Sequence, residues 1–336
     1  MNKMTLEISH RTRIEQCLEG QKTDRIPFAF WRHFPVDDQD PYRLAASISH
    51  FQNLYQFDLI KVTPASSYCL KDWGIQDEYR GNWEGTREYT NIIINHPDGW
   101  SKLPSLHPKQ GFLGDFLTCM QLITREFGAS TPVLPTIFSP LAQAKHLVGN
   151  QSLLVHLRKY PQEVHSGLQI ITENLLAFLD SMSHLEIAGI FYAIQHASFN
   201  LLSADEYREF GEHYDLQVLN FVKNRWLNLC HIHGDNIMFD QIAKYPVQIL
   251  NWHDRQTTPS LCEAANQFNG ILCGGLQQWN SMAVGTPADI LAEAWEAIAS
   301  TGGKKFILGT GCVLPIITPH GNIQAIRELV QNRAVG

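Results

Sequence analysis

Short apolar runs recur along the chain, and each one ends in polar or glycine-containing residues. Eight such runs lie at residues 26–31, 59–64, 133–139, 189–195, 227–234, 247–253, 271–277 and 305–312. Within a run the hydrophobic residues are continuous rather than alternating, and they include many that favour strands. Continuous hydrophobicity is typical of parallel strands that are covered on both faces. The runs therefore predict a buried parallel sheet.

Longer segments between these runs carry apolar residues at three- and four-residue spacing, notably at 161–185, 203–226 and 286–303. Ser203 and Thr286 are the expected N-caps of two of these helices, and the segment after Thr286 ends on glycine. Eight strand-then-helix units predict an α/β fold, a single (β/α)₈ TIM barrel over residues 1–336. An open doubly wound sheet is the alternative, but no glycine-rich dinucleotide motif follows the first run.

The segment between the second and third runs is longer than the other connections. We interpret residues 65–132 as an insertion within the barrel, with a hairpin that lies over the barrel mouth. Its turns are expected near Glu84-Gly85 and at Pro97-Asp98-Gly99.

Composition excludes several classes of protein. The chain of 336 residues is 44% hydrophobic and 18% charged and has a net charge of −7, so no basic surface indicates nucleic-acid binding. No run approaches the roughly 18 apolar residues that span a bilayer. Seven cysteines without framework spacing are typical of a reducing compartment. We expect a cytoplasmic protein with no membrane or nucleic-acid partner, acting alone or as a homodimer on a small-molecule substrate.

Polar side chains gather where the predicted strands end, which is where barrel enzymes hold their active sites. Histidines are frequent there: His33, His196, His231, His233 and His253. His231 and His233 are two residues apart on one strand, so their rings point to the same face, away from Cys230. A catalytic zinc ion takes three protein ligands and keeps an open position. Cys312, at the end of the eighth run, is the expected third ligand; the alternative is a hydrogen-bonded histidine pair beside an inert thiol.

Other residues at the strand ends are candidates for substrate contacts. Arg32 and Arg255 fit carboxylate or phosphate recognition, with rim salt bridges as the alternative. Asp254 is a candidate to orient a histidine, with a helix N-cap as the alternative. The remaining candidates are Tyr68, Gln195 and Trp252, of which Trp252 would line an apolar pocket or simply pack at the barrel's edge. Asp58 and Lys61 flank the second run, where a solvent-exposed pair is expected.

Several segments together carry a family resemblance: RTRIEQCLEGQKTDRIPFAFW (11–31), FSPLAQAKHLVG (138–149), IQHASFNLLSADEYREF (194–210), ILNWH (249–253), GTPADI (285–290) and FILGTGCVLPIITPHGNIQAI (306–326). In this order they resemble the uroporphyrinogen decarboxylase superfamily, which includes zinc-dependent methylcobamide:coenzyme M methyltransferases. The resemblance covers nearly the whole chain, is weakest over 75–130, and implies the same (β/α)₈ barrel.

The two branches of that family imply different chemistry. In the methyltransferase branch a His-x-Cys-Gly segment on strand five and a Gly-Cys on strand eight supply the zinc ligands. His231 and Cys312 match, while His233 stands where that branch has cysteine, which keeps a metal ligand but makes the set less rich in thiolate. In the decarboxylase branch an Arg-Gln-Ala-Gly-Arg loop grips the substrate carboxylates, and here only Arg32 matches, because the second arginine is missing.

The resemblance therefore favours a methyltransferase-like enzyme. A metal ion, zinc being expected, on His231, His233 and Cys312 would bind a thiol and lower its pKa, and the thiolate would attack a methyl group carried by a corrinoid, brought by a corrinoid protein, or by another donor. His253 and Asp254 would orient ligands or move protons, and Arg32 would hold an anionic group. One alternative is a decarboxylase acting on a porphyrinogen through Arg32, His33 and Arg255. Another is a metal-free barrel that binds a tetrapyrrole or corrinoid without turnover.

Overall fold

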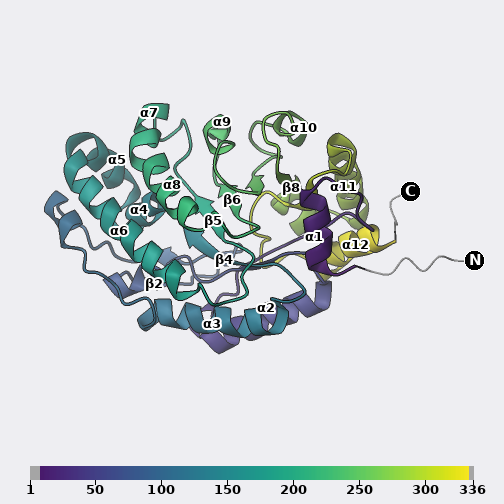
Figure 1. Ribbon diagram of the computed structural model, residues 1–336, viewed down its shortest axis with the longest axis horizontal. Helices are drawn as coiled ribbons and strands as arrows, with labels where there is room; N and C mark the ends of the chain where they lie inside the picture. The colour runs from purple at the N-terminus through teal and green to yellow at the C-terminus, as the bar shows by residue number, and fades with distance from the viewer. Residues whose placement is uncertain (1–7, 333–336) are drawn as a thin grey trace, which may run out of the picture.

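A curled parallel sheet runs through the centre of the computed structural model, which describes residues 8–332 (Figure 1). The strand order is β1-β4-β5-β6-β7-β8-β9, and every neighbouring pair is parallel. The seven strands are β1 (Ile60–Val62), β4 (Val133–Phe138), β5 (Phe191–Ile194), β6 (Leu229–Ile232), β7 (Ile249–Trp252), β8 (Ile271–Leu276) and β9 (Phe306–Thr310). They coincide with seven of the eight predicted runs.

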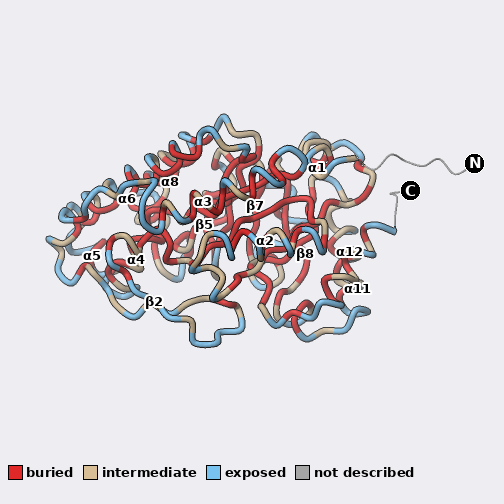
Figure 2. The backbone as a smooth tube through the Cα atoms, turned by 90° about the horizontal axis from the view of Figure 1, so that it is seen from below, coloured by how far each residue is buried: buried red, intermediate tan, exposed pale blue. Residues whose placement is uncertain are grey.

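Helices surround this sheet on its outer side (Figure 1). The longer ones are α1 (His10–Leu18), α2 (Pro41–Tyr55), α3 (Gly111–Phe127), α4 (Pro140–Val148), α5 (Asn150–Lys159), α6 (Pro161–Ser181), α8 (His213–Phe221), α11 (Pro287–Thr301) and α12 (His320–Gln331). Single-turn helices are α7 (Ala204–Tyr207), α9 (Phe239–Ile242) and α10 (Leu261–Ala264). The strands of the parallel sheet are buried and the outer turns of the helices are exposed, as Figure 2 shows.

The predicted first strand is not among the seven strands of the sheet, so the expected eight-strand closure is not confirmed. Its residues run beside β9 and the segment that follows it, and within residues 8–332 their only bridges are the isolated parallel ones Phe28–Leu308, on β9, and Arg32–Leu314, after β9. Pro27 has no N–H to donate to a ladder. The N–H of Phe28 donates to the carboxylate of Asp58 at 2.9 Å instead of to a neighbouring strand.

The helices begin where their capping residues predict. Ser203 and Thr286 each form a capping box, with Glu206 and Asp289 respectively, and α11 ends at Gly302 in the left-handed conformation with φ 62°. The segment predicted as one helix over 203–226 contains a π-helical turn at Arg208–Glu212, between α7 and α8, and ends at Phe221.

The connection between β1 and β4 contains the predicted hairpin. Its strands β2 (Asp77–Glu78) and β3 (Glu88–Tyr89) are antiparallel. Gly85 has φ +80°, and a Cβ there would lie 2.8 Å from the Cβ of His33, so the turn requires glycine. The backbone of Trp83 in this hairpin accepts a hydrogen bond from Ile316, which follows β9. Short 3₁₀ helices occupy Lys71–Trp73 and Pro97–Lys102, the second in place of the simple turn expected at Pro97-Asp98-Gly99.

The sheet separates two apolar layers. Alternate strand residues, among them Leu229, Ile249, Ile271 and Ile307, pack together on its inner face. Their neighbours, among them Ile232, Leu250, Trp252 and Leu272, pack on the outer face against the helices. Because side chains alternate along a strand, His231 shares the inner face with Leu229, and the fully buried Cys230 lies on the outer face, as predicted.

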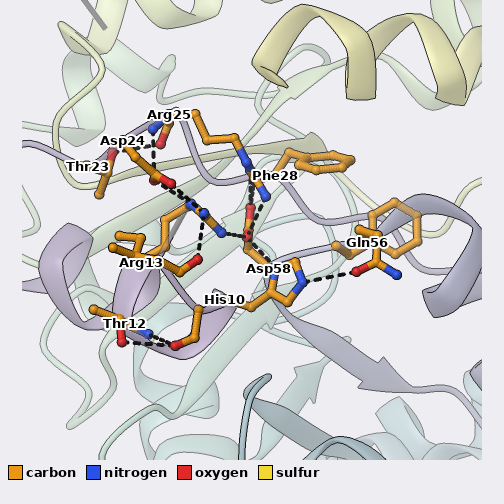
Figure 3. Close-up of polar contacts among 12 residues, drawn as sticks. His10, Thr12, Arg13, Thr23, Asp24, Arg25, Phe28, Gln56 and Asp58 are labelled. Atoms are coloured by element: carbon orange, nitrogen blue, oxygen red, sulfur yellow. Dashed lines mark hydrogen bonds and ion pairs between the residues drawn. The ribbon is translucent and has the colours of Figure 1, made fainter. Parts of the chain in front are cut away.

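A buried carboxylate ties α1 to the N-terminal end of the sheet (Figure 3). Asp58 just before β1 accepts hydrogen bonds from Arg13 at 2.7 Å and from Arg25 at 2.6 Å, and it contacts His10 at 2.8 Å. Burial acts to raise the pKa of Asp58, but these partners outweigh it and hold the pKa at about 2. The expected exposed pair of Asp58 with Lys61 is therefore wrong, since both side chains are buried and point to different partners.

Within residues 8–332, no helix is both long enough and apolar enough to cross a lipid bilayer.

Candidate metal centre

Four side chains that can ligate a metal converge at the C-terminal ends of β6, β7 and β9. One ligand atom each from His231, His233, His253 and Cys312 lies within 4.8 Å of every other. The Sγ of Cys312 is 3.8 Å from Nε2 of His231 and 3.9 Å from Nδ1 of His233. The Nε2 of His253 is 3.3 Å from Nδ1 of His233. The structure thus brings together the three predicted ligands and adds His253, to which the sequence analysis had given a role in orienting ligands or moving protons.

The sheet register makes the cluster possible. His231 on β6 is paired with Asn251 on β7, and Asn251 is paired with Cys273 on β8. His253 follows β7 by one residue and Cys312 follows β9 by two, so both residues rise from the same edge as His233. Strand ends that are far apart in the chain therefore meet at one rim.

Asn251 determines which nitrogen of His231 is free. Its amide nitrogen donates to the carbonyl oxygens of Cys273 at 2.8 Å and Thr310 at 3.0 Å, and these oxygens can only accept. Its Oδ1 therefore faces Nδ1 of His231 at 2.7 Å and accepts the N–H from it. The proton on Nδ1 leaves Nε2 unprotonated toward Cys312, which is the arrangement of a metal-ligating histidine.

The ionisation of the cluster is compatible with metal binding. Burial, together with the neighbouring rings, lowers the pKa of His231 well below its usual value and the pKa of His233 to about 4. The imidazoles are therefore neutral at pH 7 and keep their lone pairs. Burial raises the pKa of Cys312 to about 11, so a metal would have to displace the thiol proton on binding.

Lys61 is a buried cation beside this cluster that the sequence analysis did not recognise. Its ammonium lies 4.5 Å from the ring centroid of Phe191 and 5.9 Å from that of Trp31, both on the inner face. Burial lowers the pKa of Lys61 to about 8. Its positive charge acts to lower the pKa of Cys312, so it favours the thiolate that metal binding needs. Leu59 packs on the inner face of the sheet, and Lys61 is two residues further along the same strand. The alternation of side chains along a strand could therefore have predicted that Lys61 points inward.

Two predicted substrate contacts face the helices instead of the cluster. The guanidinium of Arg32 lies over the rings of Phe34 and Phe51, at 5.1 and 5.4 Å, and Phe51 belongs to α2. Trp252 is fully buried on the outer face, where its Nε1 donates to the carbonyl of Pro259 at 2.9 Å. Each is one residue out of phase with the inward-facing positions Trp31 and Asn251.

Three further candidates have structural partners. Tyr68 is buried among aromatic rings and donates to the carbonyl of Thr136 at 2.8 Å. Asp254 accepts from the backbone N–H of Gly275 at 3.1 Å. Arg255 donates to the carbonyl of Gly275 at 2.9 Å and pairs with Glu296 on α11. The alternative of a rim salt bridge is thus the arrangement that the structure shows for Arg255.

The last two candidates lie near the cluster. His33 is buried, and burial together with Lys61 lowers its pKa to about 3. Gln195 lines a cavity of about 860 Å³ that His233 also lines. This cavity extends the rim of the sheet and is large enough for a small-molecule ligand.

The curled parallel sheet, with three histidines and a cysteine at its C-terminal edge, places this protein in the class of barrel-like α/β proteins and gives it a candidate metal centre. Comparison with known protein families identifies the family within this class. Residues 54–333 match the family described as Uroporphyrinogen decarboxylase (URO-D), and the chain belongs to this family.

Its relatives in that family include methyltransferases. Methylcobamide:CoM methyltransferase MtbA of Methanosarcina acetivorans is 21% identical, with 97% of this chain and 98% of that protein covered. MtbA of Methanosarcina mazei is 22% identical over the same shares of the two chains. A methylated-thiol–coenzyme M methyltransferase of Methanosarcina mazei is 24% identical over 60% of this chain and 54% of its own length.

Solved structures agree on the fold. A methyltransferase from Methanosarcina mazei superposes with a TM-score of 0.81 at 18% identity and covers 97% of this chain and 99% of its own. A B12-independent methionine synthase from Shewanella sp. W3-18-1 has a TM-score of 0.59 at 11% identity, covering 94% of this chain and 98% of its own. The methyltransferases among its relatives support an enzyme that transfers methyl groups, as expected.

Proposed function

We propose that this protein is a zinc-dependent methyltransferase that activates a thiol for methyl transfer from a corrinoid or a similar donor. The observation that carries the proposal is the convergence of His231, His233, His253 and Cys312 within 4.8 Å. Nitrogen and thiolate sulfur are the ligands that zinc prefers, and tetrahedral sites of mixed histidine and cysteine are common. The methyltransferase names of the relatives support the reaction class.

The residues present fit such an ion. His231 offers Nε2 because Asn251 holds the proton on Nδ1, and Cys312 lies between His231 and His233. His253 is the fourth donor, and we propose that it completes the set in the absence of substrate. When bound, the ion lowers the pKa of a thiol so that a thiolate is available at neutral pH.

The residues around the ligands have their own tasks. Asn251 orients His231, and Lys61 keeps positive charge beside Cys312 so that its thiolate is favoured. His233 is exposed toward the cavity, which leaves that side of the cluster open to a small thiol. In the reaction the sulfur–carbon bond forms as the methyl group leaves its donor.

We do not propose that Arg32 holds an anionic group, because its guanidinium lies over the rings of Phe34 and Phe51. The decarboxylase alternative loses the same support. A decarboxylase of that kind would need Arg32 and Arg255 for the substrate carboxylates, but Arg255 already forms an ion pair with Glu296. A substrate with many carboxylates needs several free cations at the rim.

We also infer that residues 27–32 close the sheet into a barrel. On one side the N–H of Ala29 donates to Leu308 on β9 at 3.0 Å. On the other side the carbonyl of Phe28 accepts from Asp58, just before β1, at 2.9 Å. A closed ring would hold Lys61 and Cys312 across one interior from each other.

Metal analysis and a transfer assay test the proposal. Purified protein is expected to contain about one zinc per chain, since one set of ligands is present. Cys312→Ala and His231→Ala should lose the metal, and Cys262→Ala and His213→Ala, exposed residues outside the cluster, are the matched controls. The loaded protein should transfer methyl groups from methylcobalamin to 2-mercaptoethanesulfonate. Metal content that is unchanged in both cluster variants would refute the proposed site.

A further inference from the structure

The cavity beside the candidate metal centre contains a group of polar side chains to which the proposed chemistry gives no task. Its volume is about 860 Å³, and Lys145, His146, Gln195, His196, His233 and Asp235 are among the residues that line it. Lys145 and His146 come from α4, while Gln195 and His196 follow β5. His233 belongs to the metal centre, so a ligand in this cavity also reaches that centre.

Lys145 has no negative partner among the described residues. Its ammonium donates to Oε1 of Gln195 at 2.7 Å, and no carboxylate of residues 8–332 lies within ion-pair distance of it. An ammonium has three N–H groups, so two remain for a ligand. Burial lowers the pKa of Lys145 to about 8, which still leaves it mainly protonated at pH 7.

His196 is a second polar group without a partner. Its side chain is 1% exposed, and neither ring nitrogen has a hydrogen-bond partner in the structure. Buried polar atoms in proteins are almost always paired, with protein, water or a ligand. Burial, and the nearby charge of Lys145, lower the pKa of His196 to about 3, so the ring is neutral and offers one N–H donor and one acceptor.

The other groups at the cavity do not neutralise Lys145. Asp235 is exposed and forms no ion pair with Lys145. Its negative charge acts to raise the pKa of His253. His146 is neutral because burial lowers its pKa, and its ring stacks on Tyr89 with centroids 4.0 Å apart. The lining of the cavity therefore presents one cation without an ion pair and one buried donor, and its one carboxylate, Asp235, is exposed.

We propose that Lys145 and His196 form a subsite for the anionic group, a carboxylate or a sulfonate, of the small thiol on which this protein acts. The ammonium and a ring N–H would donate to the anion, Gln195 would hold Lys145 in place, and the cavity would place the thiol end near His233. The inference rests on the proposed function, because that function supplies the thiol. It names a recognition site on this chain in place of Arg32.

Binding of thiol-free probes tests the subsite apart from the chemistry. We would titrate ethanesulfonate and propionate into the full-length protein by calorimetry, with and without zinc. Lys145→Gln should weaken both probes by about tenfold or more, because a charge-assisted hydrogen bond is lost. His196→Leu should weaken them as well, whereas Lys223→Gln, an exposed lysine outside the cavity lining, should bind like the parent protein. Propionamide, an uncharged and thiol-free analogue of propionate, should bind equally to the parent protein and to Lys145→Gln.

The outcomes separate this inference from the proposed function. Probe binding that depends on Lys145 supports the subsite even if the protein contains no zinc, and the tighter of the two probes identifies the head group. Equal affinities in the parent protein and Lys145→Gln, or no probe binding by the parent protein, would overturn the subsite whatever the metal content. Circular dichroism of Lys145→Gln, a half-buried helix residue, verifies that the variant is folded.

Discussion

Asn251→Ala is the sharpest test of how the candidate metal centre is built. Asn251 is fully buried, and its truncation removes three hydrogen bonds, one to Nδ1 of His231 and two to the carbonyls of Cys273 and Thr310. Leaving these partners unsatisfied should lower the free energy of unfolding by about 2–4 kcal/mol. His231 would also lose the group that holds its tautomer. Loss of such a partner typically lowers the affinity for the metal about 10–100-fold.

A matched variant separates the loss of stability from the loss of metal. Asn228, just before β6, is equally buried; its Oδ1 accepts from Ile190 at 3.1 Å and its amide donates to Val222 at 3.1 Å. Asn228 lies at the opposite end of the strand from His231, so Asn228→Ala should destabilise the fold and leave the metal affinity unchanged.

The measurements are urea unfolding of the metal-free proteins and zinc competition against a chromogenic chelator. The reasoning predicts a weaker zinc affinity, equivalent to about 1.4–2.8 kcal/mol, for Asn251→Ala alone. Equal zinc affinities in Asn251→Ala and the parent protein would refute the tautomer argument. An equal loss in both asparagine variants would refute it too, because the effect would then follow from stability.

Three further predictions, from two variants, concern the fold. Asp58→Asn should cost about 3–5 kcal/mol in urea unfolding at pH 7, because Arg25 would keep a buried charge without a carboxylate partner and Arg13 would keep only its ion pair with Asp24; a loss below about 1 kcal/mol would contradict this. The pKa of Asp58 is about 2 in the folded protein, below the unfolded value of about 3.9, so the carboxylate contributes about 2–3 kcal/mol above pH 4 that disappears as the pH falls toward 2. Acid titration of stability should therefore be shallower in Asp58→Asn than in the parent protein. Gly167→Ala should lower the melting temperature, since a Cβ on α6 would lie 2.3 Å from the buried ring of Trp100, and a higher melting temperature would show that the ring can move aside.

The positions of the strands and much of the candidate site follow from local patterns in the sequence. Continuous apolar runs mark buried parallel strands, and seven of the eight runs are strands. Alternation along β6 puts His231 and His233 on one face and Cys230 on the other, because successive side chains point to opposite sides of a strand. Capping residues such as Ser203 and Thr286 mark helix starts because their side chains bond the free backbone N–H groups there.

Local patterns predict which residues share one face of a strand. The tertiary structure decides which face points to the interior and which strand ends meet. Arg32 and Trp252 stand at strand ends, yet each is one position out of phase with the inner face and packs against the helices. Pro27 and the carboxylate of Asp58 take the first run out of the sheet ladder. His253 joins the metal ligands, and Lys61 lies buried beside Cys312, because the curled sheet brings the ends of β1, β6, β7 and β9 to one rim. Neighbours in space on that rim are distant in the chain, and no short-range periodicity encodes the distance between them.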